Sequence, residues 1–346
     1  MIDPHVHLRD WKQAYKETLA HGLRVAFDAG LDGVFEMPNT DPPLTTMERV
    51  LERIALADSS GVPLFHGIFM GLTADPQQVK EAVAAHKSLF PRVVGLKLYA
   101  GGAGGALAVN DDEGLANVIT VLAKTHYDGV LAVHCEKESL LRRDLFECSS
   151  PETYALARPH EAEVRGVAEF IAKAGKAGFR GILHVCHVSH PDTIYEIERE
   201  NERGLFPITC GITPHHALLH TGMMKGPRGG SLIMNPPLRS EEVQRRLLGL
   251  LMNGRIDWIE TDHAPHLLKE KLNRKDPLPG VPGLPFYPRF IAKLKEIGMP
   301  ARIIERVTHR TIERAFGIDV ARIIHPPSQP LEKEYDFDPF ACLNDL

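Results

Sequence analysis

Two histidines one residue apart stand near the start of the chain, where residues 3–10 read DPHVHLRD. Side chains two residues apart on a β-strand share a face, so His5 and His7 project together. Arg9 joins them if the strand extends that far. Paired imidazoles of this kind are typical of metal sites, but they also occur on ordinary surface strands. The pair alone leaves both interpretations open.

The segments that must position this pair alternate along the chain. Eight short apolar runs are separated by longer amphipathic stretches typical of helices. We expect strands at residues 1–8, 33–37, 64–70, 93–98, 129–134, 181–188, 207–210 and 257–261. We expect helices at residues 11–29, 45–60, 75–88, 112–126, 160–178, 190–203, 241–253, 285–297 and 301–316. Such alternation predicts parallel βαβ units, and eight strands can close a barrel.

An open, doubly wound sheet is the alternative fold. It usually carries a G-x-G-x-x-G turn after an early strand, and GGAGG at 101–105 lacks that spacing. We therefore predict an α/β fold, a single-domain (β/α)8 TIM barrel over residues 1–316. Because the chain starts at the first strand, we expect no flanking β-sandwich domain. Residues 317–346 are expected to form a C-terminal extension packed on the barrel.

Composition narrows the class of protein. The 346 residues are 43% hydrophobic and 25% charged, as in ordinary globular proteins. A formal net charge of −5 without a basic stripe argues against nucleic acid as a partner. Five cysteines without a C-x-x-C pair, no signal peptide and no apolar run of spanning length indicate a cytoplasmic protein without a membrane partner.

The barrel prediction can be tested against the strand ends, because active groups of such barrels lie at the carboxyl ends of the strands. Four imidazoles, an amide, a lysine and a carboxylate stand there: His5, His7, Asn39, Lys97, His134, His187 and Asp262. Imidazole and carboxylate ligands suit Zn²⁺. Burial favours a neutral lysine amine, which can add CO₂ and give a carbamate able to bridge two metals. A core lysine paired with an acid is the simpler alternative.

The order of the motifs resembles that of the dihydroorotases in the amidohydrolase superfamily. The motifs are DPHVHLRD, EMPNT, GLKLYA, VHCE, HVCHVS, TPHHALL, NPPLRS, TDHAPH and PGVPG, and they span roughly residues 1–290. The resemblance implies two divalent metal ions, with Zn²⁺ expected. His5, His7 and Asp262 would hold one of them. Lys97, carboxylated on its side-chain nitrogen, would bridge to a second metal held by His134 and His187.

The resemblance also implies a substrate and a reaction. Arg9, Asn39 and His266 would contact the carboxylate of (S)-dihydroorotate. The planar guanidinium of Arg9 suits this role, because it can pair with a carboxylate through two hydrogen bonds. Asn235 would lie where the backbone of the family's enzymes contacts the amide of the substrate ring, and Pro279 would lie in the loop that covers this ring. The reaction would be reversible hydrolysis to N-carbamoyl-L-aspartate in de novo pyrimidine (UMP) synthesis. A metal-bridging hydroxide would be the nucleophile, and Asp262 the general acid and base.

The chain departs from the family pattern in two places. Many relatives carry an acid where this chain has Gly211, so any additional metal contact there is expected to be lost. Compact relatives cover the substrate with a threonine-bearing loop, whereas residues 100–111 read AGGAGGALAVND. Among the neighbouring residues, we expect His215 and His216 to brace a loop and Glu136 to support the site.

Two other functions stay open. One is a different cyclic amidase, such as a hydantoinase (dihydropyrimidinase) or an allantoinase, although Arg9 and Asn39 favour a substrate that carries a carboxylate. The other is an inactive barrel that serves as a scaffold for aspartate transcarbamoylase, although such a barrel would be expected to have lost metal ligands. The resemblance also allows a homodimer and an association of the active enzyme with aspartate transcarbamoylase.

Overall fold

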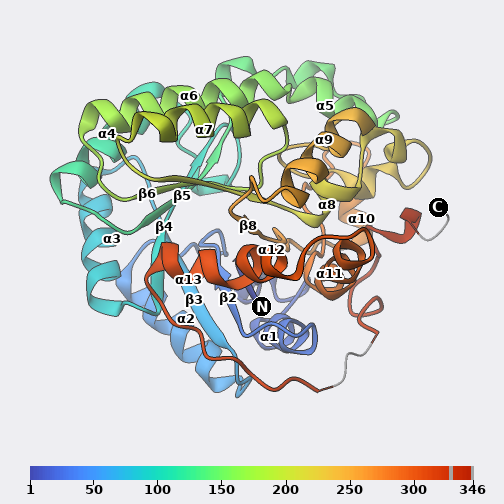
Figure 1. The fold of residues 1–346 in the computed structure, drawn as a ribbon, viewed down its shortest axis with the longest axis horizontal. Coiled ribbons are helices and arrows are strands. Elements are labelled where there is room, and N and C mark those ends of the chain that lie inside the picture. The colour runs from blue at the N-terminus through green and yellow to red at the C-terminus, as the bar shows by residue number, and fades with distance from the viewer. Residues whose placement is uncertain (327–329, 344–346) are drawn as a thin grey trace.

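A computed structural model describes residues 1–326 and 330–343, and its eight parallel strands follow one another in chain order around one sheet (Figure 1). The strands are β1 (Ile2–Val6), β2 (Gly33–Glu36), β3 (Phe65–Gly71), β4 (Val93–Ala100), β5 (Val130–Cys135), β6 (Ile182–Val185), β7 (Ile208–Ile212) and β8 (Trp258–Ile259). The predicted single-domain (β/α)8 barrel is confirmed. Among the described residues, the strand order does not reverse in the way that defines a doubly wound sheet.

The barrel closes where β1 meets the segment after β8. His263 pairs with Val6 in a parallel bridge, and the His7 amide donates to the His263 carbonyl at 2.7 Å. β8 itself has only two residues, so the closing contact falls beyond its end. The same residues flank the predicted metal ligands.

Helices surround the sheet (Figure 1). The longer ones are α1 (Leu19–Asp28), α2 (Met47–Ser59), α3 (Pro76–Leu89), α4 (Asp112–Lys124), α6 (His160–Ala177), α7 (Pro191–Arg203), α9 (Glu241–Met252) and α11 (Tyr287–Glu296). Shorter ones are α5 (Tyr154–Ala157), α8 (Pro214–Leu218), α10 (Leu268–Lys271), α12 (Ala301–Glu305) and α13 (Thr311–Phe316). Side-chain oxygens accept from backbone amides at several amino ends, as preferred N-caps do: Thr18, Thr46, Asp75, Asp111 and Ser240.

Two of the predicted helices differ from the structure. Residues 11–29 do not form one helix, because a 3₁₀ turn at Trp11–Gln13 ends early and α1 begins only after the Thr18 cap. Residues 301–316 contain a π-helical turn at Arg306–Arg310 between α12 and α13. The first difference matters for the site, since the segment between the 3₁₀ turn and α1 is free to approach the barrel rim.

Aromatic side chains fill part of the barrel interior. Phe316 of α13 packs against Phe35, Phe69 and Trp258, with ring centroids 4.9, 5.8 and 5.9 Å away. All four side chains belong to one buried cluster that includes Ile2 at the start of β1. Helix α13 therefore packs on this cluster and leaves the carboxyl ends of the strands to build the site.

The residues after α13 contact the barrel at separate points. Glu334 pairs with Arg24 and His21 of α1, at 2.6 and 3.0 Å. The ring of Phe340 lies 5.1 Å from that of Phe286.

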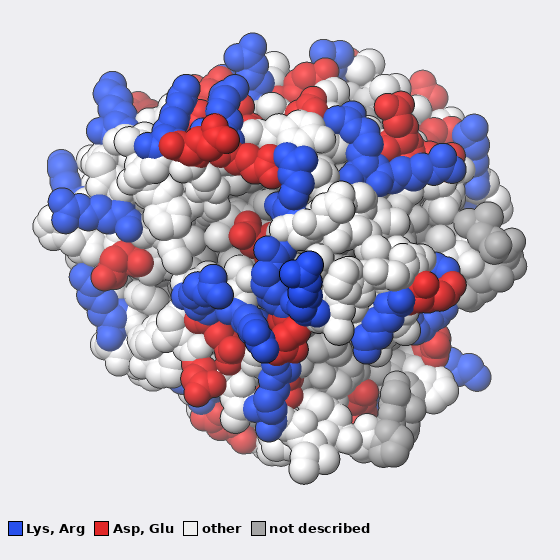
Figure 2. Space-filling model, in the orientation of Figure 1, with Lys and Arg blue, Asp and Glu red and all other residues white. Residues whose placement is uncertain are grey.

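Within the described part of the chain, no helix combines the length and apolar character needed to cross a membrane. Basic and acidic side chains are interspersed on the face shown in Figure 2.

Candidate active site

A cavity of about 780 Å³ opens at the carboxyl ends of the strands. The predicted site residues line it, with the exception of Lys97: His5, His7, Arg9, Asn39, His134, His187, Asn235, Asp262, His266 and Pro279. Lys97 is fully buried. The structure thus brings residues from most of the strand ends to one place, as the barrel prediction requires.

The first group of potential metal ligands comes from β1 and the segment after β8. Nε2 of His7 lies 2.9 Å and Nε2 of His5 lies 3.4 Å from Oδ1 of Asp262. Potential ligand atoms of the three residues all lie within 4.8 Å of one another. Nδ1 of His7 pairs with the side-chain oxygen of Asn39, which leaves Nε2 facing Asp262.

This donor set fits a divalent metal ion. His5 is buried, and neither of its ring nitrogens has a hydrogen-bond partner among the described residues. An unpaired buried imidazole is unfavourable, and a bound cation would satisfy it. Burial opposes ionisation of Asp262, but the contacts with His7 and His5 hold the pKa of its carboxyl well below the usual range. Asp262 is therefore anionic at neutral pH, as a carboxylate ligand of a divalent cation must be.

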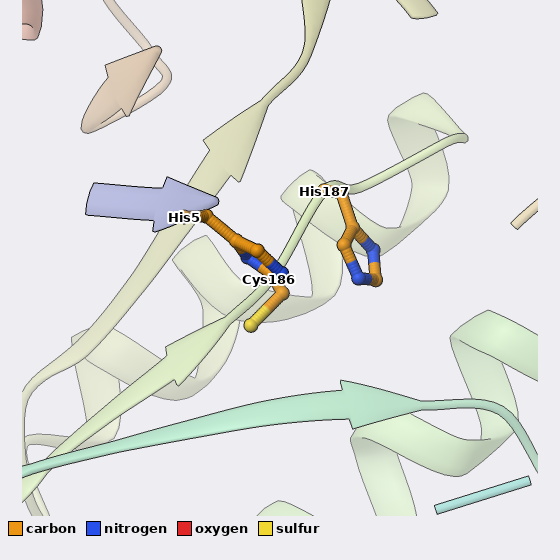
Figure 3. Close-up of side chains that lie close together, drawn as sticks. All are labelled: His5, Cys186 and His187. Carbon is orange, nitrogen blue, oxygen red and sulfur yellow. The ribbon is translucent and has the colours of Figure 1, made fainter. Parts of the chain in front are cut away.

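A second group lies beside the first. Nδ1 of His134 and Nε2 of His187 face each other at 3.3 Å. The other ring nitrogen of His134 lies 2.8 Å from Oε2 of Glu136, so the orientation of this ring is fixed. The rings of His5 and His187 are 5.1 Å apart, which connects the two groups (Figure 3). His187 adopts a left-handed backbone with φ of 38°, a conformation that a non-glycine residue needs support to hold.

Lys97 lies in the middle of β4 and is fully buried. Its Nζ is 3.0 Å from Sγ of Cys186 and 4.8 Å from the centre of the Tyr99 ring. Cys186 also lies close to His5 and His187 (Figure 3). Burial disfavours the Cys186 thiolate, but Lys97 and His5 lower the pKa of this thiol. Among the described residues no acid pairs with Lys97, so the alternative of a lysine–acid pair in the core is wrong.

The opposite wall of the cavity is cationic. Nη2 of Arg9 lies 3.4 Å from Nε2 of His266, and Nζ of Lys16 lies 3.0 Å from Nδ1 of the same ring. Burial, and then Arg9 and Lys16, hold the pKa of His266 well below its usual range, so the ring is neutral. Lys16 also pairs with Glu270 at 3.3 Å. Lys16 was not predicted as a site residue, because the sequence pattern assigns residues 11–29 to one helix.

Tyr99 was also missed. It lines the cavity, and its buried hydroxyl has no hydrogen-bond partner in the described chain. It follows Lys97 by two residues on β4, and this spacing was the signal that could have found it. Residues 102–107 of the glycine-rich loop line the cavity as well. Asn235 accepts a hydrogen bond from the Tyr154 hydroxyl at 2.8 Å.

The supporting residues behave in three ways. Glu136 bonds to His134 as expected; burial would raise its pKa, but Arg158 and His134 lower it to about 2. His216 braces the loop after β7, through Thr213 at 2.8 Å and the Pro236 carbonyl at 3.0 Å. His215 forms no hydrogen bond through either ring nitrogen among the described residues, and its buried ring lies 4.6 Å from that of His216.

Known proteins of similar sequence and structure were compared with this chain. No family model matches it. A dihydroorotase of Methanothermobacter thermautotrophicus is 31% identical over 92% of the chain and 69% of its own length. A dihydroorotase of Lactiplantibacillus plantarum is 33% identical over 92% of the chain and 72% of its own length. The chain thus spans about 70% of these relatives.

Solved structures share the fold. The L-hydantoinase of Arthrobacter aurescens matches with a TM-score of 0.80 and 24% identity, over 91% of the chain and 70% of its own length. A dihydroorotase of Saccharomyces cerevisiae, in complex with 5-fluoroorotic acid, matches with a TM-score of 0.73 and 20% identity. That match covers 93% of the chain and 85% of its own length.

The barrel and its rim of imidazoles define an amidohydrolase, a hydrolase that acts on cyclic amides. Its reaction is that of a dihydroorotase or a related cyclic amidase. Within this class, the chain belongs to the dihydroorotase family.

Proposed function

We propose that the protein is a dihydroorotase, which opens and closes the ring of (S)-dihydroorotate reversibly to give N-carbamoyl-L-aspartate in de novo pyrimidine synthesis. One observation carries the proposal. The cationic wall of Arg9 and Lys16 lies in the same cavity as the His5, His7 and Asp262 group. A substrate with a carboxylate next to a cyclic amide matches both halves of this cavity.

The substrate carboxylate would bind between Arg9, His266 and Asn39. Arg9 is buried, and a buried guanidinium gains most from a bidentate anionic partner. The Asn39 oxygen is engaged with His7, so its amide hydrogens are available to a carboxylate. The ammonium group of Lys16, which contacts His266, adds positive charge to this wall of the cavity. The ring would then extend toward His5 and Asp262, under Pro279 and beside Asn235.

Two divalent ions, in our proposal Zn²⁺, would be held by His5, His7 and Asp262 and by His134 and His187. Carboxylated Lys97 would lie between them. Bound metals would polarise the ring carbonyl and lower the pKa of water. The Lys97 nitrogen lies 3.0 Å from Sγ of Cys186, and an anionic carbamate there would be stabilised by the positive charge of the two bound cations.

Asp262 would move the proton. Its carboxylate is ionised at neutral pH, and it belongs to the group of His5 and His7 and lines the open cavity. In hydrolysis, Asp262 would take a proton from the attacking water and deliver it to the departing ring nitrogen. In the direction of ring closure, the same carboxyl would act in the opposite order.

Three further features belong to the proposal. Residues 317–346, of which 327–329 and 344–346 lie outside the described residues, would form an extension. Its described part is held on the barrel through Glu334 against α1 and through the Tyr335 hydroxyl, which bonds to Glu17. The protein would be cytoplasmic, since all five cysteines are free thiols. Homodimer formation and association with aspartate transcarbamoylase would be compatible with this function.

The test is ring opening by the Zn²⁺-loaded protein, with dihydroorotate, hydantoin and allantoin compared under one condition. We expect turnover of dihydroorotate and at most weak turnover of the two other rings, which do not carry the matching carboxylate. Turnover of hydantoin or allantoin without turnover of dihydroorotate would replace this function with that of another cyclic amidase. A protein that binds metal and opens none of the rings would favour the scaffold.

A further inference from the structure

Gly211 on β7 and Glu260, just after β8, share one space inside the barrel. A side-chain Cβ at position 211 would lie 2.4 Å from Cδ of Glu260 and 2.6 Å from both of its carboxylate oxygens. Atoms cannot approach so closely, so the carboxylate of Glu260 requires glycine at position 211. The acid expected to be missing at Gly211 is therefore replaced in space, by a carboxylate from the neighbouring strand.

The Glu260 carboxylate is fully buried and contacts four groups. One oxygen, Oε2, lies 3.0 Å from Nε2 of His184 and 3.0 Å from Nε1 of Trp258. The other, Oε1, accepts the backbone amide of His187 and faces Nδ1 of His5 at 3.6 Å. A buried carboxylate is stable only when its lone pairs are used in this way.

Two of these four contacts reach proposed metal ligands. The hydrogen bond from the His187 backbone amide to Glu260 holds His187 in its left-handed backbone conformation, which determines where its ring points. At 3.6 Å the contact with Nδ1 of His5 is longer than a hydrogen bond, but the negative charge of Oε1 favours a proton on that nitrogen and leaves Nε2 for a metal. His187 belongs to one ligand group and His5 to the other, so one carboxylate supports both.

We propose that Glu260 is the positioning residue for the metal centre, and that Gly211 is its obligatory counterpart. The inference rests on the proposed function, in which His5 and His187 bind metal. Glu260 itself is fully buried and does not line the cavity. His184 and Trp258 anchor it from below, since the His184 ring stacks on Trp258 at 4.2 Å and bonds to Thr209 at 3.1 Å.

An exchange of the two side chains tests this directly. The variants are Glu260→Ala, Glu260→Gln, Gly211→Glu and the double variant Gly211→Glu/Glu260→Ala, each as the full-length chain. Co²⁺ is titrated into the apoprotein, and its dissociation constants and visible spectrum are recorded. Thermal unfolding identifies any variant that fails to fold. The matched control is Asp32→Asn, which alters another buried acid outside the cavity.

We expect Glu260→Ala to weaken Co²⁺ binding by about 10- to 100-fold and to change the spectrum. Glu260→Gln should lose less, and Gly211→Glu should bind poorly because two carboxylates compete for one space. The double variant should recover to within about threefold of the native affinity, since it restores one carboxylate to that space. Asp32→Asn should bind Co²⁺ like the native chain.

Two results would overturn the inference. One is native Co²⁺ affinity and spectrum in Glu260→Ala. The other is a folded double variant that binds no better than Glu260→Ala. Neither readout uses dihydroorotate, so the outcomes separate: a protein whose Co²⁺ affinity depends on Glu260 but which does not open dihydroorotate contradicts only the proposed substrate.

Discussion

Nε2 of His7 lies 2.9 Å from Oδ1 of Asp262, although 255 residues separate them in the chain. Nε2 of His5 approaches the same oxygen at 3.4 Å. One carboxylate oxygen thus meets two imidazoles from the first strand of the barrel. The rest of the site extends outward from this contact, with the second imidazole pair on one side and the cationic wall on the other.

The cationic wall predicts how the enzyme selects its substrate. Arg9→Met should reduce kcat/KM for dihydroorotate by about 10- to 100-fold, because a hydrogen bond to a charged group contributes about 1.5–3 kcal/mol. Turnover of dihydrouracil, a similar ring without the carboxylate, should not fall. The control is Arg24→Met, which removes a half-exposed arginine of α1 and should leave both values unchanged. Equal losses on both rings would show that Arg9 has a structural role instead.

The bridging role of Lys97 predicts a change in metal content. Lys97→Met keeps the length of the side chain but cannot form a carbamate, so the protein should retain fewer metal ions after dialysis, as measured by elemental analysis. Lys271→Met is the control, since Lys271 is equally buried and bonds to the carbonyls of Ile233 and Leu278. Full metal content and full activity in Lys97→Met would refute the carbamate.

The ion pair behind His134 predicts a loss of stability. Glu136→Gln should lower the free energy of unfolding by about 3 kcal/mol, because it leaves Arg158 buried without its counter-charge. Denaturant unfolding measures the effect. The exposed pair of Glu138 and Arg143 is the control, and Glu138→Gln should change stability by less than about 1 kcal/mol. Similar losses in both variants would contradict the argument.

His190 predicts how stability depends on pH. Burial and the stacked ring of His160, 4.0 Å away, lower the pKa of His190 from 6.5 to about 4. The unfolded chain therefore takes up this proton first, so the contribution of His190 is complete above pH 6.5 and is lost as the pH falls toward 4.

His190→Asn removes this titration and keeps an N-cap for α7. From neutral pH to about pH 5, the native chain should lose about 1–2 kcal/mol more than the variant, a value reduced for solvent screening. Urea unfolding at both pH values measures the difference. Parallel stability profiles for the two proteins would contradict the assignment.

The sequence predicted the barrel and most of the cavity because both follow local rules. Strand periodicity and strand ends depend on residues close in the chain, so the pattern alone could place His134 at the end of β5 and His187 after β6. Lys16 could not be placed in this way, because it reaches His266 only since residues 11–29 do not form the single helix that their pattern predicts. The same limit applied to Glu260, whose carboxylate replaces an absent side chain on a different strand.

The closing bridge between Val6 and His263 has a consequence for motion. Because the described residues pair the backbone of β1 with that of the segment after β8 only by this bridge, and not by a longer ladder of hydrogen bonds, local opening of the barrel should begin here. The His7 amide takes part in the closure, while the His7 ring belongs to the ligand group. Occupancy of the site and integrity of the ring are therefore thermodynamically linked, and slower hydrogen exchange at the His7 amide would report a bound ligand.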